Sequence, residues 1–139
     1  MTILTQTPPA SSRGMIWTGR VFTTIVVLFL IMDSVIKLIP IPEVTASLRE
    51  LGYPPTVELA RFLGLLLLVC TALYVWPRTS LLGAVLLTGY LGGAIATHVR
   101  IGHPLFTHTF FGIYLGLFIW GGLYLRDAEF RALFPFRRY

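Results

Sequence analysis

The chain has 139 residues, of which 55% are apolar and only 12% are charged, with a mean hydropathy of +0.78 and a formal net charge of +5. A soluble domain averages about 45–50% apolar and about 25% charged residues, so too few polar side chains remain here to cover a water-soluble globule. This composition excludes a soluble enzyme and a disordered chain, the single Cys70 excludes an intramolecular disulfide, and the scattered basic residues argue against nucleic-acid binding.

Four apolar segments are long enough to cross a bilayer, which requires about 20 residues of helix. We predict spans at about 18–39, 57–76, 79–99 and 105–125, within a transmembrane domain of residues 15–126. The links after the second and third spans are short, so consecutive helices should be antiparallel neighbours. Residues 1–14 are predicted to form a flexible polar tail, and residues 127–139 a basic cytoplasmic tail.

The first span carries two charged residues, Asp33 and Lys37, which are one helical turn apart and can therefore pair. Asp33 lies seven residues before Pro40, about 10 Å along a helix, which is too deep for its short side chain to reach the membrane surface. Charged groups inside spans usually face the bundle interior or a wet cavity. A ligand-binding role and a role in helix packing both stay open for this pair.

A short helix is predicted between the first two spans, bounded by prolines. Val44, Leu48 and Leu51 fall on one face of it, a spacing typical of a helix that lies at the membrane surface. The expected fold is therefore an all-α membrane protein, an antiparallel four-transmembrane-helix bundle with a short interfacial helix between helices 1 and 2.

The third and fourth spans carry small residues at helical spacing. Such faces let neighbouring helices approach closely, and we favour this interpretation over a ligand groove. The residues assigned to helix packing are Gly89, Gly92, Gly93, Gly112 and Gly116.

Basic residues that flank the spans predict the orientation. Seven lie on the side that holds both termini and four lie on the other, which predicts a multi-pass protein of the cell inner membrane with both termini cytoplasmic. Asp33, Lys37, His98 and Arg100 then fall in or near the outer leaflet. These four residues are the candidate ligand-binding site, in which Lys37, His98 and Arg100 would donate hydrogen bonds to a head group and Asp33 would orient Lys37.

A haem or metal site is an alternative use of the histidines, because His98 and His108 stand on adjacent spans at similar depth. The chain lacks HxxxH and ExxH motifs and a third acidic ligand at metal spacing. We therefore expect no metal, and the sequence also shows no nucleotide-binding or nucleophile motif.

Several motifs resemble one known family. They are Lys37 before Ile39-Pro40, Leu51-Gly52-Tyr53-Pro54, Pro77-Arg78-Thr79 followed by Leu82-Gly83-Ala84, and above all TGYLGGAIATHVR at residues 88–100. Over about residues 21–125 the chain resembles the DoxX-like family of small four-helix membrane proteins. The resemblance implies that fold and an association with quinone-linked redox complexes. Members commonly carry a glutamate within helix two, whereas LGLLLLVC at residues 63–70 contains no acid.

The leading hypothesis is a membrane protein that binds a small lipid-soluble or anionic molecule, with a quinone as one candidate, as a subunit of a membrane redox assembly. Its partners would be the lipid bilayer, redox subunits or a second copy of the chain. A small proton-coupled multidrug-type transporter, in which Asp33 exchanges protons, is one alternative. A structural accessory subunit without its own ligand is another. A stand-alone enzyme is not expected, because no complete catalytic constellation can be named.

Overall fold

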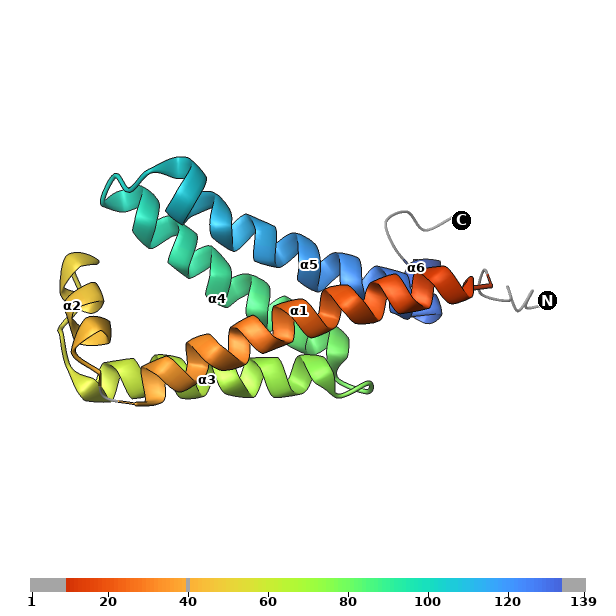
Figure 1. Ribbon diagram of the computed structural model, residues 1–139, viewed down its shortest axis with the longest axis horizontal. Helices are drawn as coiled ribbons and strands as arrows, with labels where there is room; N and C mark the ends of the chain where they lie inside the picture. Colours follow the sequence, from red (N-terminus) through yellow and green to blue (C-terminus); the bar gives the residue numbers. More distant parts are fainter. Residues whose placement is uncertain (1–9, 40, 134–139) are drawn as a thin grey trace, which may run out of the picture.

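The computed structural model describes residues 10–39 and 41–133, and every regular element there is a helix. Its four long helices are apolar enough to cross a membrane, which confirms the predicted four-span, all-α fold (Figure 1). The elements in chain order are α1 (Arg13–Leu38), α2 (Pro42–Glu50), α3 (Val57–Val75), α4 (Ser80–Arg100), the π-helical turn η1 (Leu105–Thr109), α5 (Phe110–Arg126) and α6 (Ala128–Leu133).

Local capping explains where the helices begin. The Ser12 hydroxyl accepts a hydrogen bond from the Met15 amide at 3.2 Å, so α1 starts at Arg13, five residues before the predicted span. Thr56 caps α3 in the same way, through the Leu59 amide at 3.3 Å. The predicted flexible tail falls mostly on residues 1–9, which lie outside the described residues, as does Pro40.

The segment after the fourth span differs from the predicted tail. Residues 128–133 form α6, because the Asp127 carboxylate accepts the Phe130 amide at 2.9 Å and caps the helix. The Phe130 side chain is buried against the bundle core, so this segment packs on the protein instead of leaving it. The remaining residues 134–139 lie outside the described part of the chain.

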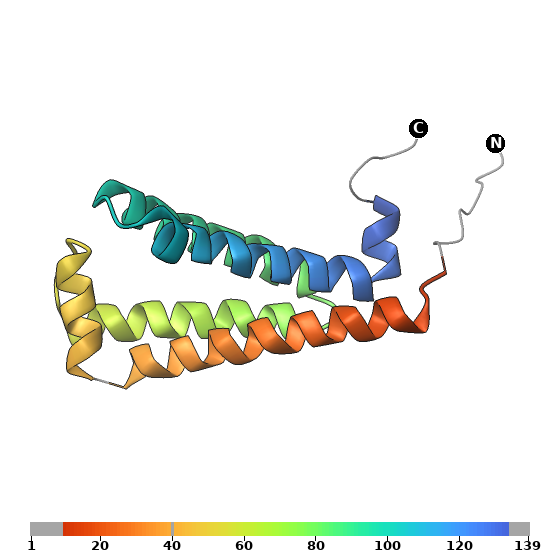
Figure 2. The same ribbon diagram turned by 45° about the horizontal axis from the view of Figure 1, so that its top comes forward.

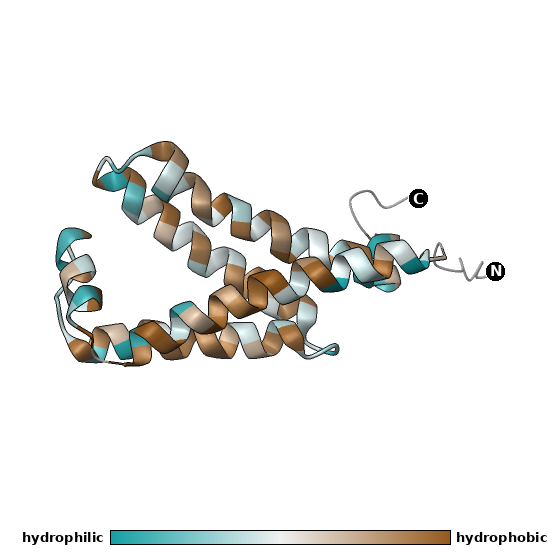
Figure 3. Cartoon of the chain, in the orientation of Figure 1, coloured by the Kyte–Doolittle hydropathy of each residue, from teal (hydrophilic) through white to brown (hydrophobic). Residues whose placement is uncertain are grey.

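The four spans form a ring in which α1 contacts α3 and α5, and α4 contacts the same two helices. Buried side chains from all four fill the centre: Val26, Leu30, Leu67, Tyr74, Leu87, Ile119 and Leu123. Hydrophobic residues recur along all four spans (Figure 3), and many large apolar side chains are exposed, among them Trp17 and Leu28 on α1, each 63% exposed. Such exposure suits a lipid environment, because soluble monomeric proteins rarely expose large continuous apolar surfaces.

Glycines make the close helix contacts, but mostly not those that the sequence suggested. A Cβ atom on Gly19 of α1 would lie 2.9 Å from the Arg126 amide nitrogen of α5, and one on Gly64 of α3 would lie 2.9 Å from the Ser34 carbonyl oxygen of α1. Of the predicted packing residues, Gly112 does meet a neighbour, since its Cβ would lie 2.8 Å from Ile95 Cγ1.

The packing prediction is wrong within this chain for Gly89, Gly92, Gly93 and Gly116. A Cβ atom on any of the four would meet no described atom within 4 Å. Gly89 and Gly93 of α4 face the cavity described below instead of a helix, and Gly92 is exposed on the outside of the same helix, so small-residue spacing did not bring a partner helix onto α4.

The two ends of the bundle differ. At the end near α6, the Arg126 guanidinium donates to the Tyr74 carbonyl at 3.1 Å and lies 4.9 Å from the Tyr74 ring centroid. The Tyr74 hydroxyl in turn donates to the Ile119 carbonyl at 2.7 Å, which ties α3 to α5. At the other end, the pair α1/α3 diverges from the pair α4/α5, and α2 lies across the end of the bundle (Figure 2). We call this the α2 end.

Candidate functional site

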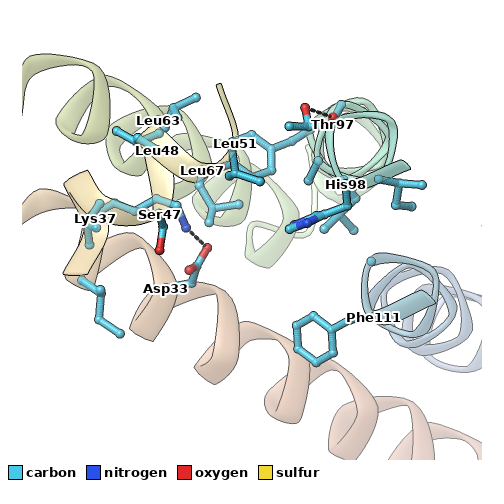
Figure 4. A pocket seen from close by; sticks show the side chains of 18 of the residues that line it. Asp33, Lys37, Ser47, Leu48, Leu51, Leu63, Leu67, Thr97, His98 and Phe111 are labelled. Carbon is cyan, nitrogen blue, oxygen red and sulfur yellow. Dashed lines mark hydrogen bonds and ion pairs between the residues drawn. The ribbon is translucent and has the colours of Figure 1, made fainter. Parts of the chain in front are cut away.

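A cavity of about 670 Å³ opens at the α2 end, between the diverging helix pairs. All four spans, α2 and η1 contribute to its wall. Most of the lining is apolar, including Phe29, Leu67, Leu91, Ile95, Phe111 and Leu115 (Figure 4). The volume and lining match those of sites that hold drug-sized molecules, which occupy about 300–1,000 Å³.

The Asp33–Lys37 pair is the charged feature of the α1 wall. The Lys37 ammonium donates to the Asp33 carboxylate, as the one-turn spacing predicted (Figure 4). The two side chains are only 23% and 32% exposed. Because the charges compensate each other, the wall offers hydrogen-bond donors and acceptors without a net charge.

His98 reaches the same cavity from the opposite wall. It lies in the last turn of α4, and its imidazole points into the space that Asp33 and Lys37 face (Figure 4). Its Nδ1 lies 2.8 Å from Nδ1 of His103, in the loop that follows α4. Three of the four predicted site residues therefore line one cavity: Asp33, Lys37 and His98.

His108 is a further lining residue, which the sequence placed beside His98 only in the haem or metal alternative. It lies in η1, where the wider π-helical turn opens the start of the fourth span. The ring centroids of His98, His103 and His108 lie 4.9–5.6 Å apart, so the three imidazoles form a cluster at the α2 end. The π-helical turn has no recognisable signature in LFTHT, which is why its geometry was not expected.

Glu50 joins this cluster from α2. Its Oε1 lies 3.3 Å from His103 Nε2, while the carboxylate side chain stays 68% exposed. The contact joins residues 53 positions apart, so only the folded arrangement of α2 across the bundle end could show it.

Arg100 corrects the prediction for the fourth candidate. It is absent from the described residues that line the cavity. Its guanidinium instead donates to the Leu51 carbonyl at 2.7 Å, next to Gly52, whose φ of +78° suits a glycine. Tyr53 adds a hydrogen bond between its hydroxyl and Thr97 Oγ1 at 3.0 Å. Arg100 therefore holds the loop after α2 against α4 and is a positioning residue.

Within residues 10–39 and 41–133, no group of three or more His, Cys, Asp or Glu side chains is arranged to hold a metal ion. The contacts among the three histidines are one hydrogen bond, between His98 and His103, and a ring contact within each pair.

The four antiparallel spans, with a ligand-sized cavity at one end, define a small multi-pass membrane protein of the helix-bundle class. The DoxX-like family model matches residues 21–122, which include every lining residue of the cavity, and the chain belongs to this family. Comparisons with curated proteins and with solved structures gave no match.

Proposed function

We propose that this protein binds a small lipid-soluble molecule with a polar head group in the cavity, with a quinone as the first candidate, and acts as a subunit of a membrane redox assembly. The observation that carries the proposal is a compensated ion pair set into a mostly apolar, ligand-sized cavity within the spans. Charged groups at such depth are costly and mark binding sites more often than they serve stability.

The chemistry of the wall favours a neutral head group over an anion. Lys37 has three N–H donors, of which Asp33 takes at least one, and the rest can donate to carbonyl oxygens. His98 offers a second polar contact from the α4 wall. Because Asp33 already cancels the charge of Lys37, an anionic ligand would find little net attraction. A quinone has two carbonyl acceptors and an apolar ring and tail, which fit this set of residues.

When bound, a quinone would supply two-electron, two-proton redox chemistry. The residues of this chain would hold and orient it: Lys37 would donate to one of its carbonyl oxygens, His98 would accept a proton from an oxygen of the reduced form, and Phe29 and Phe111 would pack against its apolar part. The DoxX-like resemblance supports the link to a redox assembly. We also propose that both termini are cytoplasmic, which is supported by the distribution of basic residues around the spans.

The test compares what co-purifies with the wild type and with two leucine variants of neighbouring glycines. Gly93 lines the cavity and Gly92 does not, and a Cβ atom on either meets no described atom within 4 Å. We expect Gly93→Leu to lose the co-purifying molecule and Gly92→Leu to keep it, with both variants as stable as the wild type.

Bound molecules would be identified by native mass spectrometry and by chromatography of a solvent extract. Equal occupancy in the two variants would reject the cavity as the binding site. An extract that holds another lipophile in stoichiometric amount, and no quinone, would reject the quinone. Quinone reductase activity of membranes that is unchanged by Gly93→Leu would reject the redox role.

A further inference from the structure

A chain of hydrogen-bonding groups leads from the cavity to the aqueous surface. It begins at His98, which lines the cavity, and passes to His103 through the 2.8 Å contact between the two Nδ1 atoms. It continues from His103 Nε2 to Glu50 Oε1 at 3.3 Å. The side chain of His103 is 19% exposed and that of Glu50 is 68% exposed, so the chain runs from the interior to water.

The carboxylate at the outer end sets the direction of these hydrogen bonds. An ionised carboxylate only accepts, so the ion-pair contact with Glu50 favours the tautomer of His103 that carries its hydrogen on Nε2. Neutral His103 then has its lone pair on Nδ1, and the short contact requires His98 to donate from its own Nδ1. This tautomer leaves the lone pair of His98 on Nε2, where a proton can be accepted.

From this geometry we infer that His98, His103 and Glu50 form a proton relay that carries protons from the cavity to the aqueous surface at the α2 end. A proton released in the cavity binds His98 Nε2, and the hydrogen on His98 Nδ1 passes to His103 Nδ1. The hydrogen on His103 Nε2 then passes to the Glu50 carboxylate, which releases it to water. Each ring gains one proton and loses one, so the charge moves outward and no other reactant is needed.

The groups around the relay are compatible with this direction. His108 of η1 faces both rings, with centroids 5.6 Å from His98 and 4.9 Å from His103. Its cationic form would repel a second positive charge, and so would Lys37 if Asp33 did not compensate it. Arg100 directs its guanidinium at the Leu51 carbonyl. The carboxylate of Glu50 contacts His103, at the outer end of the relay.

The relay rests on the proposed function for its purpose, since a ligand that exchanges protons in an apolar cavity needs a path to water. It is tested without any ligand, by nuclear magnetic resonance of the full chain labelled with ¹⁵N-histidine. The chain has three histidines, so each ring can be assigned from one substitution. We expect His98 to carry its hydrogen on Nδ1.

The second measurement is the exchange of that ring hydrogen with water, observed by saturation transfer. Glu50→Gln keeps an oxygen of the same size at the contact with His103 and removes the base, so His98 exchange should slow by about tenfold or more. Glu58→Gln is the matched control, because Glu58 is an exposed acid in the first turn of α3 and is not among the described lining residues. It should exchange as the wild type does.

If Glu50 served only to hold α2 against the loop after α4, replacing it with the glutamine of the same shape would not change this exchange rate. Hydrogen on Nε2 of His98 in the wild type, or equal exchange in Glu50→Gln and Glu58→Gln, would overturn the relay. Either result would leave the Gly93→Leu comparison unaffected, so failure of the relay and failure of ligand binding are distinguishable.

Discussion

The crossing of α1 over α5 at Gly19 leaves no room for a methyl group. A Cβ atom there would lie 2.9 Å from the Arg126 amide nitrogen, 2.9 Å from Leu125 Cβ and 3.0 Å from the Gly122 carbonyl oxygen. Favourable carbon contacts lie at about 3.5–4.0 Å, so Gly19→Ala should force the two helices apart by about 0.5 Å or more. Two of the three atoms belong to the backbone of α5, which cannot move aside without moving the helix.

Overpacking of this kind costs about 1–3 kcal/mol. Alanine also regains about 0.5–1 kcal/mol over glycine in a helix, so Gly19→Ala should lower the free energy of unfolding by a net amount of about 0.5–2 kcal/mol. Gly116→Ala in α5 is the matched control, since its Cβ meets no described atom within 4 Å. The difference between the two variants isolates the cost of the close contact.

Reversible unfolding in mixed detergent and dodecyl sulfate micelles, followed by circular dichroism, measures both free energies under two-state conditions. Gly19→Ala should unfold at a lower dodecyl sulfate fraction than the wild type, and Gly116→Ala at the same or a higher fraction. Equal free energies of unfolding for the two variants would refute the close crossing of α1 and α5.

Three further predictions concern the α2 end and the orientation of the chain. Lys37→Met should lower the free energy of unfolding by about 2.5–3.5 kcal/mol, because it leaves Asp33 charged and unpaired within the spans, and adding Asp33→Asn should restore much of that loss in the same micelle assay. A double variant that is no more stable than Lys37→Met would contradict the coupling. Arg100→Gln should speed amide hydrogen exchange in the loop after α2, measured by mass spectrometry, and should leave exchange at the α6 end unchanged. If the variant loop exchanges at the wild-type rate, Arg100 does not hold that loop. Reporter fusions after Arg78 should indicate the cytoplasm and fusions after Glu50 the opposite side, and the reverse pattern would overturn the predicted orientation.

Local features of the fold could be predicted from the sequence because short stretches of chain determine them. The four spans follow from the length of the apolar segments, and Thr56 caps α3 through its own neighbours. The Asp33–Lys37 pair follows from helical spacing alone. Each of these features depends on residues within a few turns of one another, so no knowledge of the tertiary arrangement was needed.

Features that depend on how the helices diverge could not be predicted from the sequence. Small-residue spacing on α4 looks the same whether the face meets a helix or an open cavity, and at Gly93 it lines the cavity. The close contact at Gly19 involves a lone glycine in α1, with no repeated spacing to mark it. Arg100 and Glu50 act through long-range contacts with segments about 50 positions away.

Because the two ends of the bundle differ in packing, a small rotation of one helix pair relative to the other changes the two ends unequally. Contacts around Tyr74 and Arg126 fix one end, and the cavity lies at the other. α4 has 21 residues and is therefore about 30 Å long, so a rotation of about 2° about the fixed end moves its far end by about 1 Å. Such a rotation widens the cavity by about 1 Å, while the core side chains near the fixed end move very little. Because Arg100 and Tyr53 hydrogen-bond α4 to the loop after α2, that loop would have to move together with α4 when a wider ligand enters.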